Sequence, residues 1–166
     1  MSIYKNLLDK RVAIAGAGVT GIASARALVK RGALVTFIDE KVTEIDGFIV
    51  VRPEDSSARE FDYLLVSPGW REDHPIVKWA REHDRPILNE IDLAWAIKSE
   101  IAPTQKWIAL TGTNGKTTTV ELTAHMLRTG GISAIACGNV GTTVIESVES
   151  NEKYDYLVLE LSSFQL

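Results

Sequence analysis

A short segment with two glycines, residues 110–118 (LTGTNGKTT), has the residue types of a site that binds nucleoside triphosphates. Apolar residues of strand character lead directly into the glycines, and a segment compatible with a helix follows. Glycines let the backbone wrap closely around an anion, and the N–H groups at a helix N-terminus point at it. Lys116 would reach the terminal phosphates and Thr117 would offer its hydroxyl to Mg²⁺. An ordinary strand-to-helix turn would not require this Lys-Thr pair, so the segment predicts a phosphate-binding loop.

The predicted loop is shorter than the usual P-loop. The usual pattern has a glycine five positions before the Gly-Lys pair, and Leu110 occupies that position here. We expect ATP to be held by the residues of this short loop, which are Gly112, Thr113, Asn114, Gly115, Lys116, Thr117 and Thr118.

A second glycine segment, residues 16–21 (GAGVTG), follows a short apolar strand at 11–15 and precedes an alanine-rich helical pattern. A second strand, 34–38, ends at Asp39, which is near the spacing of the acidic residue in a Rossmann unit. The order of these elements predicts that the phosphate or sugar of a nucleotide binds here. Glycines that only permit tight packing between helix and strand are the competing interpretation.

Further polar groups follow predicted strands at their carboxyl ends, where parallel sheets collect ligands. The segment Ser67-Pro68-Gly69 follows strand 61–66, and Asn139 follows strand 132–137. Strand 154–161 delivers Glu160 to the same edge as Lys116, where a nucleotide-bound Mg²⁺ would take a carboxylate. His74, before a helix predicted from Pro75, is expected to be a solvated surface residue.

Composition and charge are those of a soluble globular protein. The 166 residues are 45% hydrophobic and 24% charged, and the net charge of -4 argues against a nucleic-acid or anionic-membrane surface. The sequence has no apolar run of transmembrane length and no secretory signal, so we expect a cytoplasmic protein. The single cysteine, Cys137, excludes an intrachain disulfide and reads as a small core residue.

The fold class that these patterns predict is α/β with parallel sheets. A polar segment with Pro103, residues 98–106, is the expected linker, which divides the chain into domains 1–102 and 103–166. The first would be a Rossmann-like nucleotide domain, and the second the truncated start of a P-loop-type central domain. Three strands in about 60 residues are few for a covered parallel sheet, so we expect the second domain to be incomplete.

Three motifs in order give the chain its resemblance to a known family: residues 111–118, then 138–141 (GNVG), then 160–166 (ELSSFQL). Together they resemble the Mur ligase family, ATP-dependent enzymes that form amide bonds in bacterial cell-wall synthesis. With residues 16–21 and 67–69 included, the chain is most similar to the members that add D-glutamate.

This resemblance implies a ligase whose substrates are UDP-N-acetylmuramoyl-L-alanine and D-glutamate and whose cofactors are ATP and Mg²⁺. It implies that Lys116, Asn139 and Glu160 act in catalysis and that Thr117 and Glu160 serve the metal. The UDP-substrate would contact Gly18, Val19, Thr20, Gly21, Asp39, Ser67, Pro68 and Gly69. After Asp39 the chain reads Glu40-Lys41, where relatives carry a hydroxyl residue and arginine, and Lys41 keeps the charge without the planar guanidinium.

The family also uses a histidine and a modified lysine from a later part of the central domain, together with a further domain. We therefore expect a monomeric fragment that binds the UDP-substrate but is itself inactive. Two alternatives stay open: another ligase of the folylpolyglutamate or cyanophycin synthetase type, and a non-catalytic nucleotide-binding module.

Overall fold

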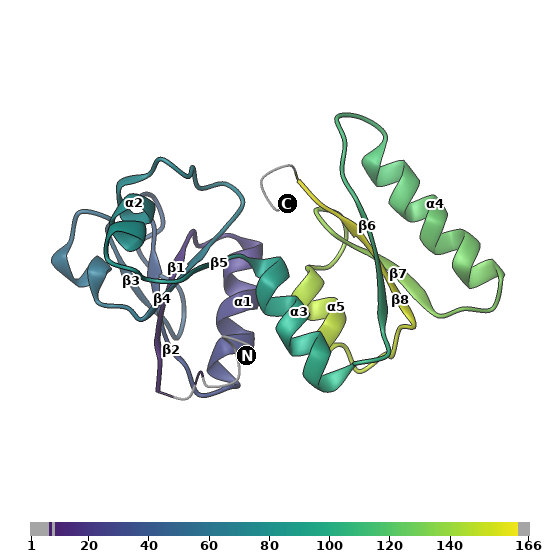
Figure 1. The fold of residues 1–166 in the computed structure, drawn as a ribbon, viewed down its shortest axis with the longest axis horizontal. Helices are drawn as coiled ribbons and strands as arrows, with labels where there is room; N and C mark the ends of the chain where they lie inside the picture. Colours follow the sequence, from purple (N-terminus) through teal and green to yellow (C-terminus); the bar gives the residue numbers. More distant parts are fainter. Residues whose placement is uncertain (1–6, 8, 163–166) are drawn as a thin grey trace. The chain divides into compact units, whose positions relative to one another are not determined.

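The computed structural model describes residue 7 and residues 9–162 of the chain (Figure 1). The described residues form two compact units, of which the first extends to Leu93 and the second begins at Ala94. Each unit has one β-sheet, and all paired strands in both sheets are parallel. The expected parallel-sheet α/β class is therefore confirmed.

The first unit has a five-stranded sheet in the order β3-β2-β1-β4-β5. Its elements along the chain are β1 (Arg11–Ala15), α1 (Val19–Val29), β2 (Leu34–Ile38), β3 (Ile49–Val51), the 3-10 helix η2 (Ser56–Arg59), β4 (Tyr63–Val66), α2 (Pro75–Glu82) and β5 (Ile87–Leu88). The strand order reverses between β1 and β4, and ligands of open α/β sheets bind at such a point, beyond the carboxyl ends of the strands.

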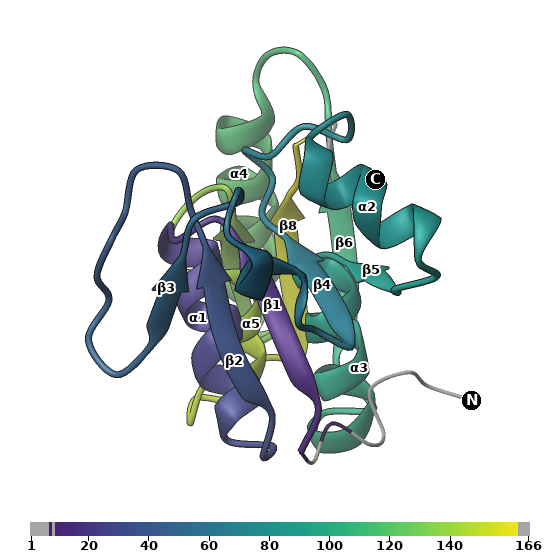
Figure 2. The same cartoon turned by 90° about the vertical axis from the view of Figure 1, so that its left-hand side faces the viewer.

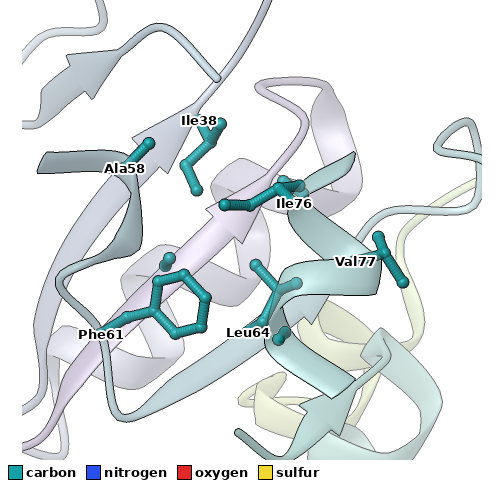
Figure 3. Packing of buried hydrophobic residues seen from close by; sticks show 9 residues of the cluster. Ile38, Ala58, Phe61, Leu64, Ile76 and Val77 are labelled. Atoms are coloured by element: carbon teal, nitrogen blue, oxygen red, sulfur yellow. The ribbon is translucent and has the colours of Figure 1, made fainter. Parts of the chain in front are cut away.

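The core of the first unit explains why β1 is buried from its second residue onward. Ala13 and Ala15 join a buried cluster with Phe61, which follows η2, with Leu64 of β4 and with Ile76 of α2 (Figure 3). Successive residues of a strand point to opposite faces. The intervening Ile14 therefore lies on the other face, beside α1, and Figure 2 shows α1 along β1 and β2. Because both faces of β1 are covered, its residues are apolar in succession and do not alternate with polar ones.

The second unit has a three-stranded sheet in the order β6-β8-β7. Its elements are β6 (Lys106–Leu110), α4 (Lys116–Thr129), β7 (Ala134–Gly138), α5 (Val144–Glu149) and β8 (Tyr156–Glu160). Helix α4 packs on β7 and β8 through Val120, Ala124, Ala136 and Val158. In the central strand, Glu160 is the register partner of both Leu110 and Gly138, so the three strands end side by side.

The expected linker at residues 98–106 is wrong in its first part, because helix α3 (Glu90–Ile101) continues through it. The Lys98 ammonium donates to the carbonyl of Pro103 at 3.1 Å and lies over the Trp95 ring. Trp95 in turn packs edge-on against Trp107 of β6. These contacts attach the end of α3 to the second unit, and the division between the units falls within this helix. Among the described residues no helix has the length and apolar character to cross a membrane.

Candidate functional site

The glycine turn after β1 is closed by contacts that leave no room for a side chain at Gly16 or Gly21. Gly16 has a φ of +104° and donates its N–H to the carbonyl of Ile38 at 3.0 Å. A Cβ on Gly16 would lie 2.9 Å from the Cβ of Ser67, and one on Gly21 would lie 2.2 Å from the carbonyl oxygen of Gly16. Gly16 and Gly21 are therefore required by the packing of the turn itself.

Gly18 differs from its two neighbours because no atom lies within 4 Å of the position of its Cβ. It is the N-cap residue of α1 and has extended backbone, and no side chain among the described residues caps this helix. The next residue, Val19, is 74% exposed. The first N–H groups of a helix have no intrahelical acceptor, so those of Val19, Thr20 and Gly21 are available to an anion. Packing explains two of the three glycines, and nothing in the packing requires a glycine at position 18.

Asp39, directly after β2, is bonded to the backbone around the glycine turn. Its Oδ2 accepts from the N–H of Ala17 at 2.9 Å, and its Oδ1 accepts from the N–H groups of Lys41 and Val42. Burial by itself would raise the pKa of Asp39, but the three backbone hydrogen bonds, with Arg52 nearby, hold that pKa below its ordinary value. The carboxylate thus ties the turn after β1 to the loop after β2.

Ser67, Pro68 and Gly69 form a turn at the end of β4, beside the glycine turn. The buried Ser67 donates its hydroxyl to the carbonyl of Gly16 at 3.3 Å and its N–H to that of Ala15 at 3.0 Å. The N–H of Trp70 closes the turn on the carbonyl of Ser67. Gly69 is exposed, with open space at its Cβ position. The structure therefore brings the predicted residues of the first domain together at one edge of the sheet.

His74 is a residue whose role the sequence did not reveal, and the expectation of a solvated side chain is wrong. Its side chain is 17% exposed. Nδ1 accepts from the N–H of Ile76, which caps α2, and Nε2 lies 3.3 Å from Oε1 of Glu40. The ring also packs edge-on against Trp70, with centroids 4.3 Å apart. The proline after His74 marked the helix start, but no local pattern could indicate a partner 34 residues earlier.

In the second unit, the predicted phosphate loop joins β6 to α4. Gly115 has a φ of +73° and is the N-cap residue of α4, and no side chain among the described residues caps the helix. The ammonium of Lys116 reaches back and donates to the carbonyl of Gly112 at 2.8 Å. Both glycines have open space at their Cβ positions. Thr113, Asn114 and Thr118 are exposed. The loop therefore presents backbone N–H groups and a cation that an anion can recruit.

Glu160 and Thr117 meet beside this loop. The hydroxyl of Thr117 donates to Oε2 of Glu160 at 2.7 Å, and Glu160 is only 6% exposed. The N–H of Asn139 donates to the carbonyl of Glu160 at 3.0 Å. Gly138 permits this close approach, because its φ is +103° and a Cβ there would lie 2.5 Å from that same carbonyl. The structure thus brings Lys116, Thr117, Asn139 and Glu160 to one edge of the second sheet.

The donor set at this edge suits Mg²⁺, which prefers oxygen ligands and takes one or two from the protein beside water and substrate phosphates. Thr117 and Glu160 offer a hydroxyl and a carboxylate oxygen. Within residue 7 and residues 9–162, no group of three or more His, Cys, Asp or Glu side chains could enclose a metal ion. A magnesium ion held by Thr117, Glu160 and a nucleotide fits these residues, and a metal cage built from protein alone does not.

Comparison with known proteins identifies relatives of both units. Residues 110–166 match the Mur ligase middle domain. Residues 163–166 of the third predicted motif lie outside the described residues. The chain is 40% identical over 99% of its length to the UDP-N-acetylmuramoylalanine--D-glutamate ligase of Tropheryma whipplei (strain Twist), of which it covers 36%. It is 36% identical over 94% of its length to the ligase of the same name from Leifsonia xyli, of which it covers 34%.

Solved structures show the same fold. The UDP-N-acetylmuramate:L-alanyl-gamma-D-glutamyl-meso-diaminopimelate ligase from Neisseria meningitides matches 92% of this chain, which covers 52% of that protein, with a TM-score of 0.53 and 18% identity. The UDP-N-acetylmuramate-alanine ligase from Thermotoga maritima also matches 92% of this chain, which covers 37% of it, with a TM-score of 0.50 and 22% identity. The chain spans about a third of the length of the curated relatives that it matches. The resemblance of this chain to the Mur ligase family is confirmed, and almost its whole length is similar to part of a UDP-N-acetylmuramoylalanine--D-glutamate ligase.

Proposed function

We propose that this chain is part of an ATP-dependent ligase that joins D-glutamate to UDP-N-acetylmuramoyl-L-alanine in peptidoglycan synthesis. The observation that carries the proposal is the 40% identity to such a ligase along 99% of the chain. Two built features agree with it: a glycine turn open at Gly18 in the first unit, and the Thr117–Glu160 pair beside the phosphate loop in the second.

The first domain, residues 1–102, would hold the UDP end of the substrate. The diphosphate would lie at the N-terminus of α1, where Gly18 leaves space and the N–H groups of Val19, Thr20 and Gly21 lack intrahelical acceptors. The turn formed by Ser67, Pro68 and Gly69 would line the same crevice. Asp39 would act by holding the turn in shape, because its carboxylate already accepts three backbone hydrogen bonds.

The second domain, residues 103–166, would hold ATP and Mg²⁺. Lys116 would exchange the carbonyl of Gly112 for phosphate oxygens, and Thr117 and Glu160 would supply two ligands of the metal. Thr113, Asn114 and Thr118 would contribute further donors around the phosphates. The exposed Asn139, beside Glu160, would face the muramoyl-alanine end of the substrate or the surroundings of the metal.

The chemistry of such a ligase requires that the alanyl carboxylate become an acyl phosphate, which the amine of D-glutamate then attacks with loss of phosphate. Bound ATP would supply the phosphoryl group. Lys116 would neutralise charge that develops on the transferred group, and the loop would align that group with the carboxylate. The rest of the machinery lies in parts of the relatives that this chain does not match. We therefore propose that the chain alone is a cytoplasmic monomer that binds the UDP-substrate without turning it over.

Calorimetry on the 166-residue chain tests this proposal with three ligands: UDP-N-acetylmuramoyl-L-alanine, UDP and NAD. We expect the first two to bind and NAD to bind far more weakly. A folded sample that binds neither uridine nucleotide would refute the assignment of the first domain. Tight NAD binding without a response to UDP would favour the non-catalytic module.

The division of labour between the domains has its own test in Lys116→Ala. We expect this variant to lose affinity for MgATP, because the cation of the phosphate loop is gone, and to keep its affinity for UDP-N-acetylmuramoyl-L-alanine. Lys153→Ala is the matched control, since it removes the same charge from an exposed position in the same unit. If Lys116→Ala weakened the binding of the UDP-substrate as much as the binding of MgATP, the proposed division of roles between the two domains would be wrong.

A further inference from the structure

A pocket of about 310 Å³ lies on one face of the first sheet, and no residue of the glycine turn lines it. Its floor is formed by alternate residues of three strands, among them Ala13 of β1, Thr36 of β2 and Val51 of β3. Such residues share a face, because successive residues of a strand point to opposite sides. Ala58 of η2 and Phe61 belong to the opposite wall (both are labelled in Figure 3). The volume is at the lower end of the range for pockets that hold small organic molecules.

The pocket exists because the chain covers this face of the sheet unevenly. The connection from β4 to β5 contains the eight-residue helix α2, which packs on η2 and β5. The connection from β3 to β4 returns across the same face, because crossovers between parallel strands are right-handed. Within this fully described connection, residues 52–62, the one helical segment is the four-residue η2. A single 3-10 turn is too short to cover β2 and β3, so Leu34 and Ile49, which line the pocket, are 58% and 67% exposed.

The charged residues that line the pocket differ in whether another charge compensates them. Arg11 is paired with Asp62, because its Nη2 lies 3.6 Å from Oδ1 and its backbone N–H donates to Oδ2 at 2.9 Å. Glu60 is exposed, and its carboxylate has no hydrogen bond or ion pair within the described part of the chain. The hydroxyls of Thr36 and Ser57 also have no partner among those residues. An apolar pocket with one uncompensated carboxylate and two hydroxyls is complementary to a cationic hydrogen-bond donor and not to an anion.

We propose that this pocket binds a small organic cation that has an apolar body and one primary ammonium group. The apolar body would lie on the strand floor and remove the exposed side chains of Leu34 and Ile49 from water. The ammonium would donate to the carboxylate of Glu60 and to the hydroxyl of Thr36 or Ser57. This site is separate from both nucleotide sites proposed above, because neither the glycine turn nor the phosphate loop lines the pocket.

The first test adds 4-phenylbutylamine to the 166-residue chain, whose methyl groups are isotopically labelled for NMR. Molecules of about a dozen heavy atoms bind with millimolar dissociation constants, and we expect the methyl signals of Leu34, Ile49 and Val51 to shift along a saturating curve in that range. The matched ligand is 4-phenyl-1-butanol, in which a hydroxyl replaces the ammonium, and it should bind severalfold more weakly. Unshifted signals at these three residues, or shifts that spread over both units without saturation, would overturn the proposal.

The ionic contact is tested by Glu60→Gln, with Glu54→Gln as the matched control. Both substitutions remove one exposed carboxylate from the connection between β3 and β4. We expect Glu60→Gln to weaken the binding of the amine severalfold, which is what a partly exposed ion pair contributes, and to leave the binding of the alcohol unchanged. Glu54→Gln should change neither. Equal weakening of the amine by the two variants would show a response to the net charge of -4, and the assigned contact with Glu60 would be wrong.

The location of the bound amine is tested by Thr36→Phe, which fills the pocket from its floor with a residue that strands accept well. Thr43→Phe places the same ring at an exposed loop position and is the control. We expect the methyl shifts to disappear in Thr36→Phe and to remain in Thr43→Phe. Binding that persists in Thr36→Phe would place the amine elsewhere. If the same methyl signals moved with protein concentration in the absence of the amine, the face would be a contact between copies of the chain, and the small-molecule assignment would fall.

Discussion

The fit between α1 and the glycine turn predicts that Gly21→Ala destabilises the first unit. A Cβ on Gly21 would lie 2.2 Å from the carbonyl oxygen of Gly16, and real contacts of this kind are not shorter than 3.0 Å, so the two must separate by at least 0.8 Å. The carbonyl has little freedom to move, because Ser67 donates to it and the N–H of Gly16 is bonded to Ile38.

The expected magnitude follows from two opposing effects. Overpacking of a tight contact costs about 1–3 kcal/mol, sometimes more. Alanine gains up to about 1 kcal/mol over glycine within a helix, and Gly21 is the third residue of α1. Because the clash is with backbone and not with the end of a flexible side chain, we take the upper part of the first range. The net loss should then be about 2 kcal/mol.

Hydrogen exchange followed by mass spectrometry can assign this loss to one unit. A loss of about 2 kcal/mol raises the opening equilibrium about 30-fold, and the increase should appear in β1, α1 and β4. Peptides of β6, β7 and β8 provide an internal reference. Gly18→Ala is the matched control, because no atom lies near the Cβ position of Gly18 and the backbone there is extended. The free energy of unfolding of this variant should differ from that of the wild type by less than about 1 kcal/mol. Equal protection of the amides of β1, α1 and β4 from exchange in Gly21→Ala and Gly18→Ala would show that the contact between Gly21 and the carbonyl of Gly16 does not limit stability.

Three further substitutions have expected outcomes. The pKa of Asp39 is lowered in the folded chain, so the ionised carboxylate stabilises the fold above a pH of about 4, and this effect is lost as the pH falls through the folded pKa. Asp39→Asn should therefore be less stable than the wild type at pH 5, and urea titrations should show this difference in unfolding free energy becoming smaller toward pH 3. A difference that stays constant over this range would contradict the prediction. Thr143→Ala removes the capping box with Glu146 at the start of α5, and the free energy of unfolding should fall by about 0.5–2 kcal/mol, whereas Thr143→Ser should retain most of it. Gly138→Ala would press a Cβ against the carbonyl of Glu160, so we expect weaker MgATP binding by calorimetry, and affinity equal to that of the wild type would show that the β7 end adapts freely.

Much of the fold could be predicted from local patterns. Apolar strands, glycines and helix-start residues recur in the order that a parallel α/β unit requires, and the resulting element positions agree with the structure to within a few residues. The meeting of Thr117 and Glu160 also followed from the sequence, because parallel strands end at a common edge. The predicted ends of the elements were less accurate where a helix continued into a polar segment, as α3 does through Lys98.

The details that the sequence could not provide are contacts between distant segments. The bonds of Asp39 to Ala17 and of His74 to Glu40 join residues 22 and 34 positions apart. Their existence depends on how loops from β1, β2 and β4 converge. The three glycines of the first turn look equivalent in the sequence, yet only the structure separates Gly16 and Gly21, which neighbouring atoms require, from Gly18, which has open space.

The pairing of β8 also determines which kinds of genetic change the second unit can tolerate. Glu160 is in register with both Leu110 and Gly138, so its position at the sheet edge depends on the number of residues that precede it in β8. Inserting or deleting one residue within β8 would rotate the strand's side chains to opposite faces, and Leu159 or Leu161 would then face Thr117. A substitution in this strand changes one side chain, whereas a single-codon insertion or deletion displaces every side chain beyond it in the register.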